Sequence, residues 1–198
     1  MDLIGYRQSP KTTAETSSGF SLVELLVAAG IVSVISAVVL TNYRGFDNSI
    51  LLTNLAHEVA LSVREAQVFG VSVRGQGSDF SAGYGLHLDT DSPGTFILFA
   101  DTQAGGGYSS SFDTDVDIYS FNSNFGIESL QQIQSGGGYS TIDGAVDIVF
   151  TRPDPEPDFY VNGVFQSMTG VRINIESPDS STRAVEVYST GQISVVYD

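Results

Sequence analysis

The sequence predicts an α+β protein in which one long N-terminal helix packs on an antiparallel β-sheet head. Three observations support this prediction. An uninterrupted apolar run spans residues 20–40, and apolar residues then recur at helical spacing up to about residue 69. Beyond that point the chain consists of short runs rich in Val, Ile, Phe and Tyr, separated by turn residues. Several short strands under one amphipathic helix form an α+β head.

Composition narrows the class of protein. The chain has 198 residues and is 41% hydrophobic, which fits one modest domain plus an anchor. Asp and Glu total 23 against 8 Lys and Arg, so the formal net charge is −15. An acidic surface repels phosphate backbones, which disfavours nucleic-acid binding. There is no cysteine, so disulfides and thiolate metal sites are excluded.

The first element is the apolar run FSLVELLVAAGIVSVISAVVL, residues 20–40. As a helix it would be roughly 31 Å long, which matches the hydrocarbon thickness of a bilayer. No charged residue lies between Leu25 and Tyr43. The run therefore predicts a membrane-spanning helix, and a buried core helix is the alternative interpretation.

The residues around the start of this run are unusual. An ordinary secretory signal is cut after its apolar stretch, which is then lost. Here the small residue Gly19 precedes the stretch, so cleavage at Gly19 would remove a polar leader, residues 1–19, and keep the helix. Glu24 lies inside the run, where an acid costs roughly 2.5–3.5 kcal/mol at the membrane centre and usually marks function. A helix-end Glu that merely reaches the headgroups is the alternative.

The segment Gly19-Phe20-Ser21-Leu22-Val23-Glu24, with the apolar residues after it, resembles the prepilin cleavage and methylation motif of type IV pilin-like proteins. The resemblance implies that a prepilin peptidase/methyltransferase cuts between Gly19 and Phe20 and methylates Phe20. It also implies that subunits pack these helices into a fibre core. From the placement of Glu24 one helical turn after Phe20, we expect this carboxylate to act in assembly.

Three later segments resemble GspH/FimT-type minor pseudopilins more loosely: residues 61–73, 96–101 and 183–196. The firm match covers about the first 40 residues. The chain departs from many pilins in two respects. It has no proline between Phe20 and Phe69, and it cannot close a C-terminal disulfide.

The helical pattern continues after Asn48. Leu52, Leu55, Val59, Val63 and Ala66 recur at spacings of three and four, which places them on one face of a helix. We therefore expect one helix from residue 20 to about residue 69, whose second half covers a sheet. The predicted division is a transmembrane and assembly half, residues 20–48, and a globular head, residues 49–198.

The head contains seven runs with strand character, separated by turn clusters such as Asp91-Ser92-Pro93-Gly94. The proline-rich segment 152–157 is expected to be extended, since each Pro restricts the residue before it. The predicted strands are Tyr84–Leu88, Thr95–Ala100, Val116–Phe121, Ala145–Phe150, Val171–Ile175, Ala184–Tyr188 and Ile193–Tyr197.

Asp113, Asp115 and Asp117 alternate along one of these runs and form a candidate Ca²⁺ site, because calcium prefers hard oxygen ligands. The Gly that an EF-hand loop requires is missing. The alternation also fits a strand with Val116 and Ile118 directed inward and the carboxylates in water.

No catalytic residue and no cofactor are predicted. Glycine triplets at 105–107 and 136–138 lack the Gly-Lys-Ser/Thr of a phosphate-binding loop and are interpreted as two loops. His57 and His87 have no Ser or Glu partner at motif spacing, which disfavours a hydrolase triad.

These features lead to the hypothesis of a non-enzymatic structural subunit, a minor pilin or pseudopilin of a type IV pilus or type II secretion-type fibre. Such a subunit would cross the inner membrane once, with its head outside the cytoplasm. Its expected partners are the prepilin peptidase/methyltransferase, other pilin or pseudopilin subunits, the inner-membrane assembly platform and the lipid bilayer. The alternatives are a pilin-like DNA-uptake or adhesin receptor and a membrane-anchored ligand-binding or enzymatic domain.

Overall fold

One helix, α1, runs from Leu22 to Val71 over 50 residues. The computed structural model describes residues 19–72, 82–102, 106–121 and 124–197, except that the side chains of 41–47 within α1 are not described. The chain divides into two units, Met1–Tyr43 and Arg44–Asp198, which are described separately. The single helix predicted from residue 20 to about 69 is confirmed within two residues at each end.

The second half of α1 presents the predicted apolar face to the core of the head. Leu52, Val59, Val63 and Ala66 are fully buried, and Leu55 is nearly so. Burying one aliphatic side chain of this size contributes roughly 1.5–3 kcal/mol. The face predicted from the spacing of these residues is therefore confirmed, and it holds the helix on the head.

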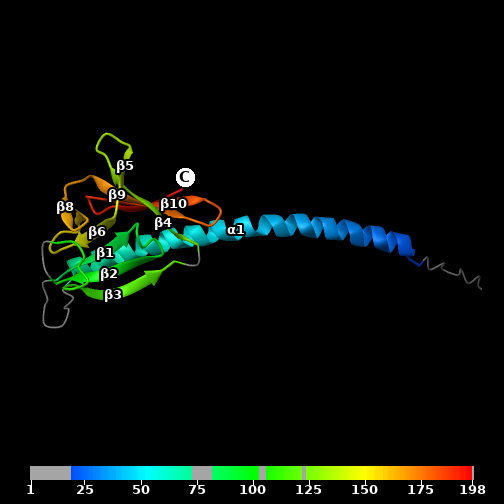
Figure 1. Ribbon diagram of the computed structural model, residues 1–198, viewed down its shortest axis with the longest axis horizontal. Coiled ribbons are helices and arrows are strands. Elements are labelled where there is room, and N and C mark those ends of the chain that lie inside the picture. The colour runs from blue at the N-terminus through cyan, green and yellow to red at the C-terminus, as the bar shows by residue number, and fades with distance from the viewer. Residues whose placement is uncertain (1–18, 73–81, 103–105, 122–123, 198) are drawn as a thin grey trace, which may run out of the picture. The chain divides into compact units, whose positions relative to one another are not determined.

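The strands of the described residues form two antiparallel sheets (Figure 1). One has six strands in the order β3-β2-β1-β6-β7-β8, and the other has five in the order β11-β10-β9-β4-β5. The six-stranded sheet contains β1 Gly83–Asp89, β2 Thr95–Asp101, β3 Thr114–Ser120, β6 Ala145–Phe150, β7 Pro157–Val161 and β8 Val164–Gln166. The five-stranded sheet contains β4 Gly126–Ile133, β5 Tyr139–Ile142, β9 Gly170–Glu176, β10 Thr182–Tyr188 and β11 Ile193–Val196.

The larger hydrophobic cluster joins the helix to both sheets. Val63 of α1, Ile148 of the six-stranded sheet and Ile173 of the five-stranded sheet are fully buried members of the same cluster. The α+β class is therefore confirmed, but the expectation of one sheet was wrong. Alternating apolar residues indicate which face of a strand is buried, and they do not indicate which strands pair.

All seven predicted strands exist, and four others were missed: β4, β5, β7 and β8. The buried side chains of β4 are Ile127, Leu130 and Ile133, three residues apart, so the strand lacks simple alternation. A register shift between Ile127 and Ser129 explains part of this spacing. β7 begins at Pro157, and a proline argues against a strand.

Strand β3 also corrects a prediction. A bulge lies opposite Leu98 and Phe99, because these neighbours pair with Asp117 and Asp115 and skip Val116. The extra residue shifts the inward phase, so that Tyr119 rather than Ile118 packs against the core beside Val116. Ile118 is instead 56% exposed.

The far end of α1 is attached to two loops by Gln67, which is buried. Its side-chain Nε2 donates to the carbonyl of Pro155 at 2.8 Å and to that of Gly191 at 3.1 Å. Gly191 has a φ of +78°, and a Cβ there would meet Pro155 O, so this turn requires glycine. The helix, the β6–β7 loop and the β10–β11 turn are thus joined at one point.

Candidate functional site

The first turn of α1 carries the segment that the sequence analysis singled out. The backbone N–H of Glu24 donates to Ser21 Oγ at 3.2 Å, and that of Leu25 donates to the Ser21 carbonyl at 3.1 Å. Ser21 is therefore the N-cap and Glu24 the third helical residue, which is the spacing of a capping box. A carboxylate at this position is also favoured by the helix dipole. The sequence analysis missed this local role, although the spacing Ser21-x-x-Glu24 signals it.

Gly19 and Phe20 precede the helix and lie outside any helix or strand. Phe20 is 78% exposed, and a Cβ placed on Gly19 would meet nothing within 4 Å. The bond between them is thus in an accessible, non-helical segment, the kind of backbone that proteases cut. The remainder of the predicted leader, residues 1–18, lies outside the described residues.

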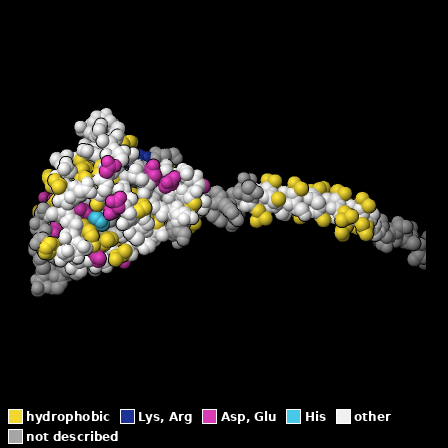
Figure 2. Space-filling view, viewed as in Figure 1, with side chains coloured by type: hydrophobic (Ala, Val, Ile, Leu, Met, Phe, Trp, Pro, Cys, Tyr) yellow, Lys and Arg dark blue, Asp and Glu magenta, His cyan; other side chains and the backbone are white. Residues whose placement is uncertain are grey.

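The segment Leu22–Leu40 is long and apolar enough to cross a membrane, and none of it is buried inside the protein. Apolar side chains line it in Figure 2, whereas carboxylates gather on the face of the head that this view shows. An uncovered apolar surface of this extent marks contact with a membrane or another protein. A candidate transmembrane helix near the N-terminus is therefore established.

The three aspartates of the calcium candidate are each engaged locally. Asp113 accepts hydrogen bonds from the N–H groups of Thr102 at 3.1 Å and Ser109 at 2.8 Å. Asp115 accepts from the Tyr108 hydroxyl at 2.8 Å, and Asp117 accepts from the backbone of the next residue. Within the described part of the chain, no three His, Cys, Asp or Glu side chains converge as metal ligands do.

A polar cluster that the sequence analysis missed lies on the outer face of the six-stranded sheet. His87 and Asp147 are direct cross-strand partners on β1 and β6, with Nδ1 and Oδ1 2.5 Å apart. Asp147 is buried and also accepts the N–H of Tyr108 at 3.0 Å. No spacing rule could find this pair, since 60 residues separate its members.

The His87–Asp147 pair fixes the β2–β3 loop against the sheet. The Tyr108 ring lies 4.5 Å from the His87 ring and 5.1 Å from Phe99, centroid to centroid. Burial and the hydrogen bond to Asp115 raise the pKa of Tyr108 to about 12, so its hydroxyl remains a donor. A Cβ on Gly107 would collide with Asp147, so only glycine allows this close approach. The arrangement stabilises a loop, and nothing in it requires catalysis.

A second buried network lies on β9 and β10 of the five-stranded sheet. Arg172 and Glu186 are cross-strand partners, both buried, with Arg172 Nη1 3.0 Å from Glu186 Oε1. The hydroxyls of Tyr139 and Tyr188 donate to the same carboxylate at 2.9 and 2.7 Å. Burial alone would raise the pKa of Glu186, but the hydrogen bonds from Tyr188, Tyr139 and Arg172 outweigh it and lower this pKa.

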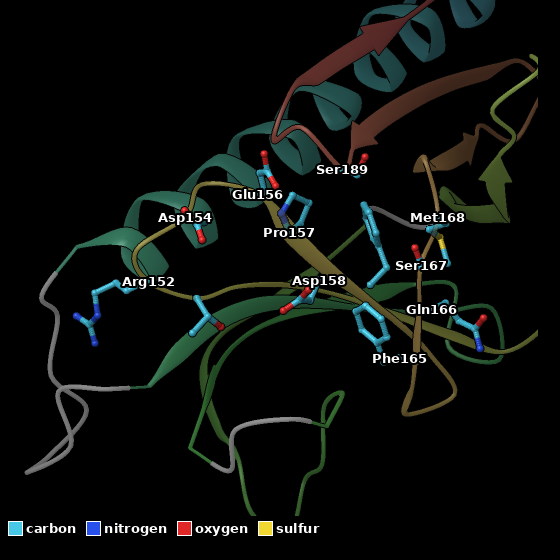
Figure 3. A pocket seen from close by; sticks show the side chains of 12 residues that line it. Arg152, Asp154, Glu156, Pro157, Asp158, Phe165, Gln166, Ser167, Met168 and Ser189 are labelled. Atoms are coloured by element: carbon cyan, nitrogen blue, oxygen red, sulfur yellow. The ribbon is translucent and has the colours of Figure 1, made fainter.

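A depression of about 420 Å³ lies between the β6–β7 loop and the segment that follows β8 (Figure 3). Asp154, Glu156 and Asp158 line it together with Phe165, and all four side chains are exposed. In Figure 3, Arg152 lies at the opposite end of this depression from Phe165. The polar groups are spread along an exposed surface, whereas ligand pockets usually converge a few polar groups on an enclosed apolar cavity.

The comparisons with known proteins give no relative: neither the protein-family models, nor the curated proteins, nor the solved structures contain a significant match to this chain.

Proposed function

We propose that this chain is a non-enzymatic subunit of a type IV pilus or type II secretion-type fibre, a minor pilin or pseudopilin that assembles through its N-terminal helix. In this proposal, a prepilin peptidase/methyltransferase cleaves between Gly19 and Phe20 and methylates Phe20. The mature helix then holds the chain in the inner membrane with its head outside the cytoplasm, until the assembly platform moves it into the fibre.

The observation that carries the proposal is the exposed apolar helix Leu22–Leu40, which begins directly after the segment Gly19-Phe20-Ser21. A transmembrane anchor alone would explain the apolar residues. It would not explain a polar leader before them. The capped first turn supports the proposal further, because backbone N–H groups at a helix start need partners in a bilayer or a fibre core.

The structure of the head gives less support to the two alternatives, a ligand-binding domain and a DNA receptor. A ligand-binding head would have to use a depression like that lined by Asp154 and Glu156, whose carboxylates are exposed to water. A DNA receptor needs accessible cations. Among the arginines with described side chains, Arg172 is buried against Glu186, which leaves three others in a chain with 23 acids. A structural subunit requires neither a ligand pocket nor accessible cations.

Cell fractionation tests the proposal. We expect the tagged chain in both the membrane and the sheared-fibre fraction of its native host, and only in the membrane fraction of a host that lacks the prepilin peptidase. The tag belongs after residue 197, so that it leaves the N-terminal helix unchanged. A chain found only in the membrane of the wild-type host, or freely soluble, would contradict the proposed function.

A further inference from the structure

The described side chains distribute positive charge very unevenly over the head. Four arginines have described side chains. Arg172 is buried against Glu186, and Arg152 donates to the carbonyl of Ser72 beside the acidic depression. The other two, Arg64 and Arg183, lie on the side of the head where α1 meets β11.

A chain of contacts joins these cations. The Arg183 guanidinium lies 5.5 Å from the centre of the Tyr197 ring, and the Tyr197 hydroxyl lies 3.1 Å from His57 Nε2. His57 and Arg64 both line a groove of about 240 Å³ between α1 and β11, here called the α1–β11 groove. The two cations Arg64 and Arg183 thus lie in one region of a strongly acidic chain, linked through Tyr197 and His57.

The α1–β11 groove is also apolar. Leu61 lines it and is 69% exposed, and Val68, two turns further along α1, is 54% exposed. The other wall is β11, an edge strand whose four residues are all half-buried. Single exposed leucines are common on protein surfaces, but an apolar groove flanked by the rare cations of an acidic chain is typical of an interface.

A complementary surface exists on β3, the edge of the other sheet. Ile118 is turned outward by the β3 bulge, and Phe112 in the preceding turn is 61% exposed. The exposed carboxylate of Asp115 lies on the same face of β3 as Ile118, because their cross-strand partners Phe99 and Ile97 pack together on the outer face of the sheet. The three residues Phe112, Asp115 and Ile118, here called the β3 patch, match the α1–β11 groove in apolar character and oppose it in charge.

We propose that the α1–β11 groove of one copy binds the β3 patch of a second copy of this chain. The reason is charge: two bodies of formal charge −15 repel each other unless the few cations meet carboxylates. The two surfaces differ, so the contact is heterologous, and repeated heterologous contacts build a helical filament. The inference deepens the proposed function, since it names the head-to-head contact within the fibre.

Disulfide cross-linking tests the contact cleanly, because the chain has no cysteine. Leu61→Cys and Ile118→Cys are placed on two differently tagged full-length chains and expressed together in the native host. After mild oxidation, we expect a linked pair of the two chains at about ten times the yield of either variant alone. Arg64→Glu should lower this yield about tenfold, the effect of about 1.4 kcal/mol, and Asp115→Arg on the other chain should restore it.

The matched control replaces Ile118→Cys by Phe165→Cys, which has similar exposure and lies in the acidic depression of Figure 3. Linkage to Phe165→Cys instead, or dimers formed by Leu61→Cys alone, would overturn the proposal. Cross-links are scored in the membrane and fibre fractions separately. Absence of linkage from both overturns the contact even if fibres form, whereas linkage in membranes without any fibre supports the contact and contradicts only the fibre role.

Discussion

Glu24→Val is expected to leave the protein in the membrane and to remove most of it from the fibre. After the proposed cleavage, Phe20 would carry an amine that is largely positive at neutral pH, because α-amines titrate near 8. In a packed fibre core, the amine of an incoming subunit can pair with the Glu24 carboxylate of a neighbour. Breaking a buried ion pair costs roughly 3–5 kcal/mol, so we expect incorporation to fall by tenfold or more.

The capped first turn adds a second explanation for Glu24 that the experiment must separate. Glu24→Gln preserves the spacing of a capping box, because Gln also serves at the third helical position, but it removes the charge. Ser21→Ala removes the N-cap side chain and keeps the charge. If the carboxylate pairs between subunits, Glu24→Gln should fail in the fibre like Glu24→Val, while Ser21→Ala should lose much less.

The readout is the ratio of processed protein in sheared fibres to that in membranes. Processing should persist in all three variants, because Gly19 and Phe20 are unchanged. Normal incorporation of Glu24→Gln together with a defect in Ser21→Ala would show that Glu24 only caps the helix, and the inter-subunit role would then be wrong.

Arg172→Ala is expected to destabilise the head by about 3–5 kcal/mol, a large part of the stability of one domain. The change leaves the buried Glu186 carboxylate without its cation, although the hydroxyls of Tyr139 and Tyr188 still donate to it. Denaturant unfolding of a fragment covering residues 44–198 measures this loss, and the wild-type fragment is expected to unfold cooperatively.

Two comparisons assign the loss to the ion pair. The double variant Arg172→Met, Glu186→Leu should regain most of the stability, because apolar replacement of a whole buried pair is often neutral.

The pKa of Glu186 in the folded head lies below its ordinary 4.5. The stability that the ionised Glu186 carboxylate contributes to the head is therefore present above pH 4.5. It is lost as the pH falls through the lower pKa of the folded state.

The loss of unfolding free energy in Arg172→Ala, relative to the wild-type fragment, should accordingly be largest at pH 7 and become smaller in acid. A deficit that does not change with pH would indicate lost packing by Arg172 instead. A double variant as unstable as Arg172→Ala would indicate the same.

The sequence predicted the helix well because its signals are local. The apolar run up to Leu40 and the spacing of Leu52, Val59 and Val63 depend only on neighbours within a few turns. The same holds for the seven confirmed strands. The hairpin β7–β8 could also have been found, since Asn162-Gly163 is the strongest two-residue turn signal and both residues have positive φ.

Other features could be identified only from the folded structure. The division of strands into two sheets depends on pairings between distant segments, such as β4 with β9. The His87–Asp147 and Arg172–Glu186 pairs are made by strand register, and register cannot be derived from local periodicity. The bulge that exposes Ile118 likewise leaves no mark in the sequence, so the alternation of Asp113, Asp115 and Asp117 correctly placed Val116 inward and wrongly placed Ile118 there.

The N-terminus of the native protein tests the central claim most directly. Peptide mass spectrometry on the chain isolated from its own host should find a mature N-terminus at Phe20 that carries one methyl group on its amine. The claim depends on the position of Gly19 just before the apolar helix. A chain that begins at Met1 or after residue 40, or one cut at Phe20 without methylation, would contradict the predicted processing.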